Sequence, residues 1–223
     1  MVDGVNMMKS VLTEQVEQVN SKTVRIKAAS KKSAATRQRV LEVSSDLFRR
    51  NGYQATSMRD IANAVAMKSG SLYYYYDSKE ALLAAILNDK IDAHLATVKG
   101  AVDALPADAS ARQKFDVAIA VTVRIITEAG DMAVASAQTL SFLQEPEYSE
   151  QSQRRRAYNQ FWRDLIIEGK RTGEIRTDFP DAVASMAIVG ALTFTAEWYE
   201  KERSTTDEIG SIFSRLLFDG LHS

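Results

Sequence analysis

The chain has 223 residues, of which 45% are hydrophobic, and its formal net charge is only -1. It contains no cysteine, which excludes disulfides, thiolate nucleophiles and cysteine-based zinc sites. Because the whole molecule is not a polycation, any nucleic-acid contact must come from a local patch. No apolar run reaches membrane-spanning length and no signal peptide is evident at the start, so we expect a cytoplasmic protein that does not enter a membrane.

Residues 1–33 are polar and irregular, and they end in a basic run. We predict a flexible basic extension, either a solvated tail or an arm that contacts phosphates or enters a minor groove. An apolar stripe that includes Val40 and Phe48 then predicts a helix over residues 35–51. Arg37 lies near the start of this helix.

The most informative stretch begins at Ser57. Ser57 and Asp60 form a capping-box pattern, which predicts that a short helix begins there. Ile61 and Val65 recur at helical spacing and give this helix one apolar face.

A turn and a second short helix are expected next. Residues 66–68 are short enough for the turn of a helix-turn-helix, and the helix that follows over residues 69–73 is too short to be stable alone. We expect Leu72 and Tyr76 to hold it against the core, and we expect a long helix to begin after residue 78.

The second short helix has the chemistry of a DNA-reading element. It begins with small and polar residues, over 68–71, and tyrosines follow over 73–76. Small residues let a helix approach a surface closely, tyrosine hydroxyls donate to phosphate oxygens, and the major groove admits one helix. The alternative is an aromatic core cluster, but four consecutive helical residues cannot all face one core.

This stretch resembles the DNA-binding segment of TetR-family transcriptional regulators, which share R-D-I-A, G-[ST]-LYYHF and SKEEL motifs. The corresponding residues here are 59–62, 70–76 and 78–82. Ala66 replaces the usual turn glycine, which predicts strain if that turn needs a positive φ. Tyr75 and Tyr76 stand where His and Phe are common, so the contact made at Tyr75 is left open.

Residue chemistry and the resemblance together predict a set of side chains that contact double-stranded DNA. They are small, polar, basic or phenolic, and they lie in or beside the helix-turn-helix: Arg37, Ser57, Arg59, Lys68, Ser69, Gly70, Ser71, Tyr73, Tyr74, Tyr75 and Lys79.

The rest of the chain also has helical periodicity, so we predict an all-α protein. After the long helix over 78–102, we predict a connector at 105–110 that is also a domain boundary. Helices are expected over 115–126, 132–143, 158–166, 182–199 and 209–218, the third closed by Gly169 and Gly173. We divide the chain into a basic extension (1–33), a helix-turn-helix DNA-binding domain (34–80) and a helical ligand-binding and dimerisation domain (81–223).

The last two helices are apolar over most of their surface. A helix without a polar face must be covered on several sides, and pairing with a second copy would cover both. The resemblance implies the same homodimer. A two-fold dimer presents two symmetry-related DNA-binding domains, which predicts a near-palindromic operator.

An apolar cavity between helices is the default site for a small-molecule effector. The alternative is that the same residues simply fill the core. The lining that we predict is aromatic, with one arginine for an anionic head group: Phe142, Arg155, Tyr158, Phe161, Trp162, Phe194 and Trp198.

Residues 193–221 resemble the end of TetR-like regulators of fatty-acid, sterol and aromatic-acid breakdown. That resemblance implies release from DNA by an acyl-CoA thioester, and it makes the protein a repressor. A multidrug-type repressor of an efflux pump and a helical protein-interaction module are the alternatives. An enzyme is not expected, because only His94 and His222 are present and no carboxylates cluster in a motif. We expect no cofactor and no metal.

Overall fold

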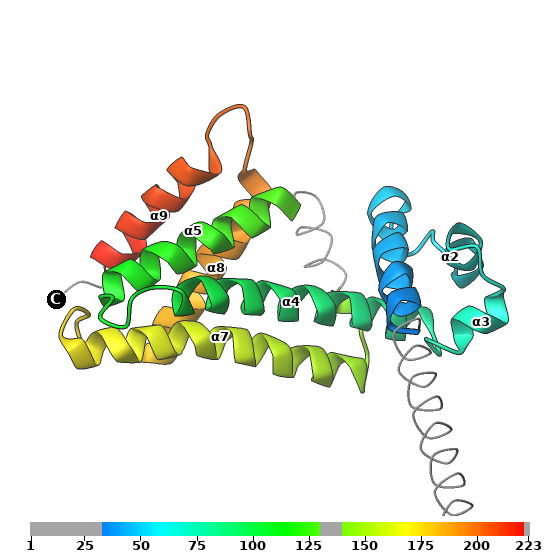
Figure 1. The fold of residues 1–223 in the computed structure, drawn as a ribbon, viewed down its shortest axis with the longest axis horizontal. Helices are drawn as coiled ribbons and strands as arrows, with labels where there is room; N and C mark the ends of the chain where they lie inside the picture. The colour runs from blue at the N-terminus through cyan, green and yellow to red at the C-terminus, as the bar shows by residue number, and fades with distance from the viewer. Residues whose placement is uncertain (1–32, 130–139, 221–223) are drawn as a thin grey trace, which may run out of the picture.

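The computed structural model describes residues 33–129 and 140–220, and all of the regular elements in them are helices (Figure 1). The all-α prediction is therefore confirmed. The basic extension, apart from its last residue, and most of the helix expected over 132–143 lie outside the described residues. The described elements, in chain order, are a helix over 33–51, α2 (Met58–Ala64), α3 (Ser69–Tyr73), α4 (Lys79–Asp103), α5 (Ala111–Ala129), the 3₁₀ turn η1 (Leu140–Phe142), α7 (Glu147–Thr172), α8 (Asp181–Trp198) and α9 (Thr206–Asp219).

Helix α4 connects the two parts of the molecule. Its N-cap is Ser78, whose hydroxyl accepts a hydrogen bond from the amide of Ala81. It is 25 residues long, which is roughly 37 Å at 1.5 Å per residue. Figure 1 shows it running from the small domain with α2 and α3 into the bundle of α5, α7, α8 and α9.

Two apolar cores share this helix. The N-terminal core includes Val40, Ile61 and Leu72 and takes residues 82–87 of α4, whereas the C-terminal core takes Val98 and Val102. The boundary between the two cores therefore lies inside α4, several residues after the predicted end of the DNA-binding domain at position 80. The C-terminal core continues on both sides of the connector at 105–110.

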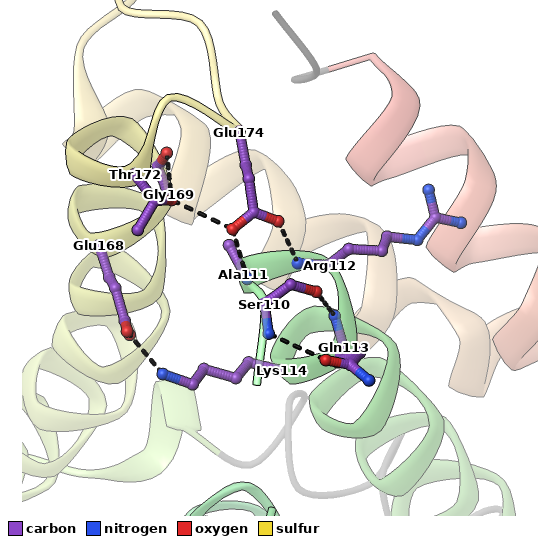
Figure 2. Close-up of polar contacts among 9 residues, drawn as sticks. All are labelled: Ser110, Ala111, Arg112, Gln113, Lys114, Glu168, Gly169, Thr172 and Glu174. Carbon is purple, nitrogen blue, oxygen red and sulfur yellow. Dashed lines mark hydrogen bonds and ion pairs between the residues drawn. The ribbon is translucent and has the colours of Figure 1, made fainter. Parts of the chain in front are cut away.

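The start of α5 is capped by a residue from the far end of α7 (Figure 2). Helix α7 ends at Gly173, whose φ of 81° lies in the left-handed region that favours glycine. The next residue, Glu174, accepts hydrogen bonds from the amides of Ala111 (2.9 Å) and Arg112 (3.2 Å). These bonds, the Ala111 bond first, lower the pKa of the Glu174 carboxyl.

Gly169 has a packing role and does not end α7, which corrects the sequence prediction. A Cβ at this position would lie 2.5 Å from the Cδ1 atom of Ile175, so the glycine lets the end of the helix pack against the chain that follows. None of the helices within residues 33–129 and 140–220 has both the length and the apolar character needed to cross a membrane.

Candidate nucleic-acid interface and effector region

The first helix of the helix-turn-helix begins with the predicted capping box. The Ser57 hydroxyl accepts from the amide of Asp60 (3.2 Å), and the Asp60 carboxylate accepts from the amide of Ser57 (2.9 Å). The Ser57 hydroxyl also donates to that carboxylate, which is the largest cause of the lowered pKa of Asp60. Ile61 and Val65 are buried, as their spacing predicted.

The turn between α2 and α3 uses a positive φ at a residue that is not glycine. Ala66 has φ 58°, and the amide of Met67 then donates to the carbonyl of Ala62 at 2.8 Å. An L-residue in this region brings its Cβ close to the following carbonyl oxygen, which costs roughly 1–2 kcal/mol. The expected strain at Ala66 is therefore present.

Helix α3 has only five residues, and buried side chains hold it in place. Leu72 is fully buried and Tyr76 is 4% exposed, as predicted. Arg37, from the helix over 33–51, donates through Nε to the Tyr76 hydroxyl at 3.3 Å. Burial raises the pKa of Tyr76, and Arg37 opposes the rise. The C-terminal half of α3 is thus fixed, while its N-terminal end faces outward.

Nine of the eleven predicted DNA contacts are exposed, and only Tyr75 and Lys79 are partly buried. Tyr74 is 84% exposed and Tyr73 is 48% exposed, whereas Tyr75 packs partly against the N-terminal core. At Gly70, an added Cβ would meet nothing within 4 Å. Packing inside the chain therefore does not explain the glycine at this position.

The environment of Lys79 differs from the expected one. Its Nζ donates to the carbonyl oxygens of Tyr53 (2.9 Å), Thr56 (3.0 Å) and Gln54 (3.4 Å), and it lies 4.3 Å from the centre of the Tyr53 ring. Lys79 is therefore engaged within the chain, and its contact with DNA stays a prediction. Lys79 connects the start of α4 to the loop that precedes α2, and no local sequence pattern predicts this contact.

Phe142 also lies elsewhere than predicted. Its ring stacks on Tyr53 with centroids 5.0 Å apart, and the neighbouring Leu143 is buried in the N-terminal core. The Tyr53 hydroxyl donates to Glu80 at 3.1 Å. The end of η1 and the residue after it therefore pack against the DNA-binding domain, away from the C-terminal bundle.

The other six predicted effector residues do not form one site. Tyr158 and Phe161 both pack against Trp162 on α7, with ring centroids 6.5 Å and 5.5 Å from it. Phe194 is 62% exposed and Trp198 is 43% exposed, both on α8, and Arg155 is exposed as well. Only the α7 trio belongs to the interior.

A groove of about 550 Å³ runs between α4, the connector after it and α7. Its apolar lining includes Leu95, Val102, Phe161 and Leu165. Charges of both signs line it as well: Lys99, Lys114, Asp103, Asp164 and Glu168. Of these lining residues only Phe161 was predicted from the sequence, because they come from separate segments and form no motif.

A short recognition helix, fixed by its C-terminal half and exposed at its small, polar N-terminal end, defines a helix-turn-helix DNA-binding regulator. Residues 40–86 match the family described as bacterial regulatory proteins, tetR family. Residues 108–221 match the tetracyclin repressor-like C-terminal domain. The chain therefore belongs to the TetR family of transcriptional regulators, whose members are not enzymes.

Relatives of known function and structure extend over most of the chain. The HTH-type transcriptional repressor KstR2 of Rhodococcus jostii is 25% identical over 190 residues, which cover 84% of this chain and 91% of the relative. A TetR/AcrR-family regulator from Thermobifida fusca is 31% identical, with a TM-score of 0.66 over 84% of this chain and 98% of its own. The structure of AibR in complex with isovaleryl coenzyme A and operator DNA has a TM-score of 0.70 at 22% identity, over 82% of this chain and 98% of its own.

Proposed function

We propose that the protein is a repressor that binds a near-palindromic operator as a homodimer and leaves it when a small apolar effector binds. We further propose an acyl-CoA thioester as the effector class. The similarity to KstR2, a transcriptional repressor, and to AibR, whose structure contains isovaleryl coenzyme A and operator DNA, supports these proposals. The observation that carries the DNA-binding part is the exposed start of α3.

That end of α3 combines close approach with hydrogen-bond donors. Gly70 has open space where a Cβ would stand, and Ser69 and Ser71 beside it are exposed. Tyr73 and Tyr74 follow, with hydroxyls that can donate to phosphate oxygens. The proposed roles are close backbone approach for Gly70, base-edge or backbone contact for the serines, and phosphate contact for the tyrosines.

Basic side chains around α3 supply the sequence-independent part of the affinity. Lys68 is exposed at the N-cap of α3, Arg59 is exposed on α2, and Arg37 is exposed beside Tyr76. Lysine and arginine that neutralise phosphates release counterions, so their contribution falls as salt rises.

The proposed dimer face is an apolar stripe on α8 and α9. Val183, Met186, Phe194 and Trp198 share one side of α8, and each is between 43% and 62% exposed. On α9, Ile212 is 42% exposed and Leu216 is 68% exposed. Such a stripe has the character of a protein interface, and a two-fold axis would bury it against itself. Sedimentation of Leu216→Glu against wild type tests this, and a wild-type chain that stays monomeric would contradict it.

A matched pair of glycine variants tests DNA binding. Gly70→Ala and Gly100→Ala each add one methyl group in open space, the first on α3 and the second on α4. Both should keep or slightly raise stability, since alanine favours helix by about 1 kcal/mol. We expect Gly70→Ala to weaken binding to fragments from around the gene's own promoter at least tenfold, and Gly100→Ala to bind like wild type. Equal binding by the two variants would reject the proposed docking of α3.

The salt dependence of the same titrations separates the regulator from a protein-interaction module. Phosphate neutralisation makes affinity fall steeply with salt, whereas a module that binds only proteins has no DNA affinity to lose. Calorimetry with CoA thioesters, drugs and free acids then identifies the effector class. An effector weakens operator binding only by its differential affinity for the two states. No CoA binding at millimolar concentration rejects the thioester, and binding of drugs alone would favour the efflux-pump repressor.

A further inference from the structure

The DNA-binding domain carries one aromatic side chain with very little packing around it. Tyr74 is the C-cap residue of α3, and at 84% it is the most exposed large apolar side chain in the described part of the chain. Exposed side chains exchange rotamers within picoseconds to nanoseconds unless a neighbour restricts them. A ring that meets DNA must give up this freedom, which costs affinity. A contact that already holds Tyr74 in its bound orientation in the free protein therefore favours binding.

The ring of Tyr75 makes a contact of this kind. The rings of Tyr74 and Tyr75 meet edge to face, with centroids 5.5 Å apart and planes at 87°. Aromatic pairs prefer this arrangement, because the positive edge of one ring lies against the negative face of the other. The contact restricts the directions that the exposed ring can take.

Tyr75 can hold its neighbour because it is itself held. Its side chain is partly buried and packs against the N-terminal core. The amides of Tyr75 and Tyr76 both donate to the carbonyl of Leu72, at 2.9 Å and 3.1 Å, and the side chains of Leu72 and Tyr76 are buried. The backbone on both sides of Tyr75 is therefore fixed to the core, and the Tyr75 ring contacts both that core and the exposed ring.

Two roles in DNA binding are chemically open to a tyrosine at position 75. Its hydroxyl can donate to a phosphate oxygen, or its ring can order Tyr74. The contacts favour the second role, because they engage the ring of Tyr75 and leave the most exposed position to Tyr74. The first role requires the hydroxyl and the second requires only the ring, so a single substitution separates them.

We propose that Tyr75 is a positioning residue, whose ring is anchored on the N-terminal core and holds the Tyr74 ring in the orientation in which Tyr74 contacts the operator. This inference rests on the proposed DNA-binding function and adds the residue that orders one of its contacts. Such ordering raises the apparent affinity by the factor by which it raises the binding-competent fraction. An aromatic pair of this geometry accounts for roughly a twofold to tenfold change in such an equilibrium.

Titration of promoter fragments against the full chain tests the proposal with a double-mutant cycle. Tyr75→Phe keeps the ring and removes the hydroxyl, whereas Tyr75→Leu removes the ring and keeps an apolar side chain against the core. We expect Tyr75→Phe to bind like wild type and Tyr75→Leu to bind about threefold to tenfold more weakly. In a Tyr74→Ala background, Tyr75→Leu should cause no further loss, because the ring that Tyr75 orders is absent.

The cycle distinguishes positioning from a general structural role. A weakening of the whole domain by Tyr75→Leu would reduce DNA affinity equally with and without the Tyr74 ring. Tyr148→Leu, which removes an exposed tyrosine of α7, is the matched control and should bind like wild type. Thermal denaturation of each variant shows whether it is folded at the temperature of the titration.

Three results would each overturn the proposal: equal affinity of Tyr75→Leu and wild type, a loss in Tyr75→Phe as large as that in Tyr75→Leu, or an undiminished loss in the Tyr74→Ala background. The second result would assign the Tyr75 hydroxyl to DNA, and the third would leave Tyr75 a purely structural residue. Wild-type binding together with a failed cycle rejects the positioning role alone. A wild-type protein without affinity for any promoter fragment at low ionic strength rejects the proposed function, and this inference with it.

Discussion

The contact of Lys79 with three carbonyl oxygens allows a sharp test of what this lysine does. Lys79→Met keeps the aliphatic stem and removes the ammonium, which donates at 2.9, 3.0 and 3.4 Å to the loop before α2. Hydrogen bonds to charged groups contribute roughly 1.5–3 kcal/mol each when well buried. Because the side chain is partly exposed, and the longest bond is weak, we expect a net loss of about 2 kcal/mol in the free energy of unfolding.

Urea denaturation and DNA titration distinguish the two roles of this residue. If Lys79 positions the helix-turn-helix, Lys79→Met lowers the urea midpoint, and the slope of log affinity against log salt stays as in wild type. If Lys79 contacts a phosphate, the slope falls by about 0.9. Lys68→Met is the matched control, because Lys68 is exposed at the start of α3. We expect it to lower the slope and leave stability unchanged. A Lys79→Met protein with wild-type stability and a reduced slope would refute the structural role.

Three further predictions concern single contacts. Ala66→Gly should raise the free energy of unfolding by about 1 kcal/mol, because glycine adopts the φ of 58° without steric cost. A melting temperature below that of wild type would contradict this prediction. Phe142→Ala should lower the free energy of unfolding by about 2 kcal/mol, since the ring is partly buried against Tyr53. The matched control Tyr148→Ala, at an exposed position, should change it by less than about 0.5 kcal/mol. Glu174→Gln should destabilise the protein at pH 7, because the ionised carboxyl caps α5. The pKa of Glu174 is lowered by folding, so its stabilisation is present above the unfolded value near 4.5 and is lost as pH falls through the lower folded value. Denaturation curves of the variant and wild type should converge in acid, and a constant difference from pH 7 to pH 3 would contradict the assignment.

The sequence predicted best those features that depend on neighbouring residues. The capping box at Ser57 and the positive φ at Ala66 each follow from a few adjacent positions. The burial of Leu72 and Tyr76 followed from their four-residue spacing on one helix face.

Features that depend on long-range packing were not predictable in the same way. Lys79 meets carbonyl oxygens from more than twenty positions earlier, and Glu174 caps a helix that begins 63 residues before it. Neither partner leaves a local pattern in the chain. Helix α8 shows the same limit, because it is apolar over most of its surface. Periodicity alone could not tell which of its faces the bundle covers, and Phe194 and Trp198 proved to lie on the uncovered one.

Helix α4 is a route by which a structural change in the C-terminal bundle can be transmitted to the DNA-binding domain. Leu87 is the last α4 residue in the N-terminal core, and His94, which contacts Tyr158 of α7, lies seven residues later on the same helix. Seven residues are two turns, or roughly 10 Å, within one continuous hydrogen-bonded element. Under the proposed effector control, a ligand that displaced the turn carrying His94 would also displace the turn of α4 that packs under α2 and α3. The stack of Phe142 on Tyr53 gives the bundle a second contact with the same domain. Two contacts hold the DNA-binding domain in one orientation relative to the bundle, whereas a single contact would let it rotate. Under the proposed effector control, loss of either contact should therefore weaken the effect of the effector on DNA binding.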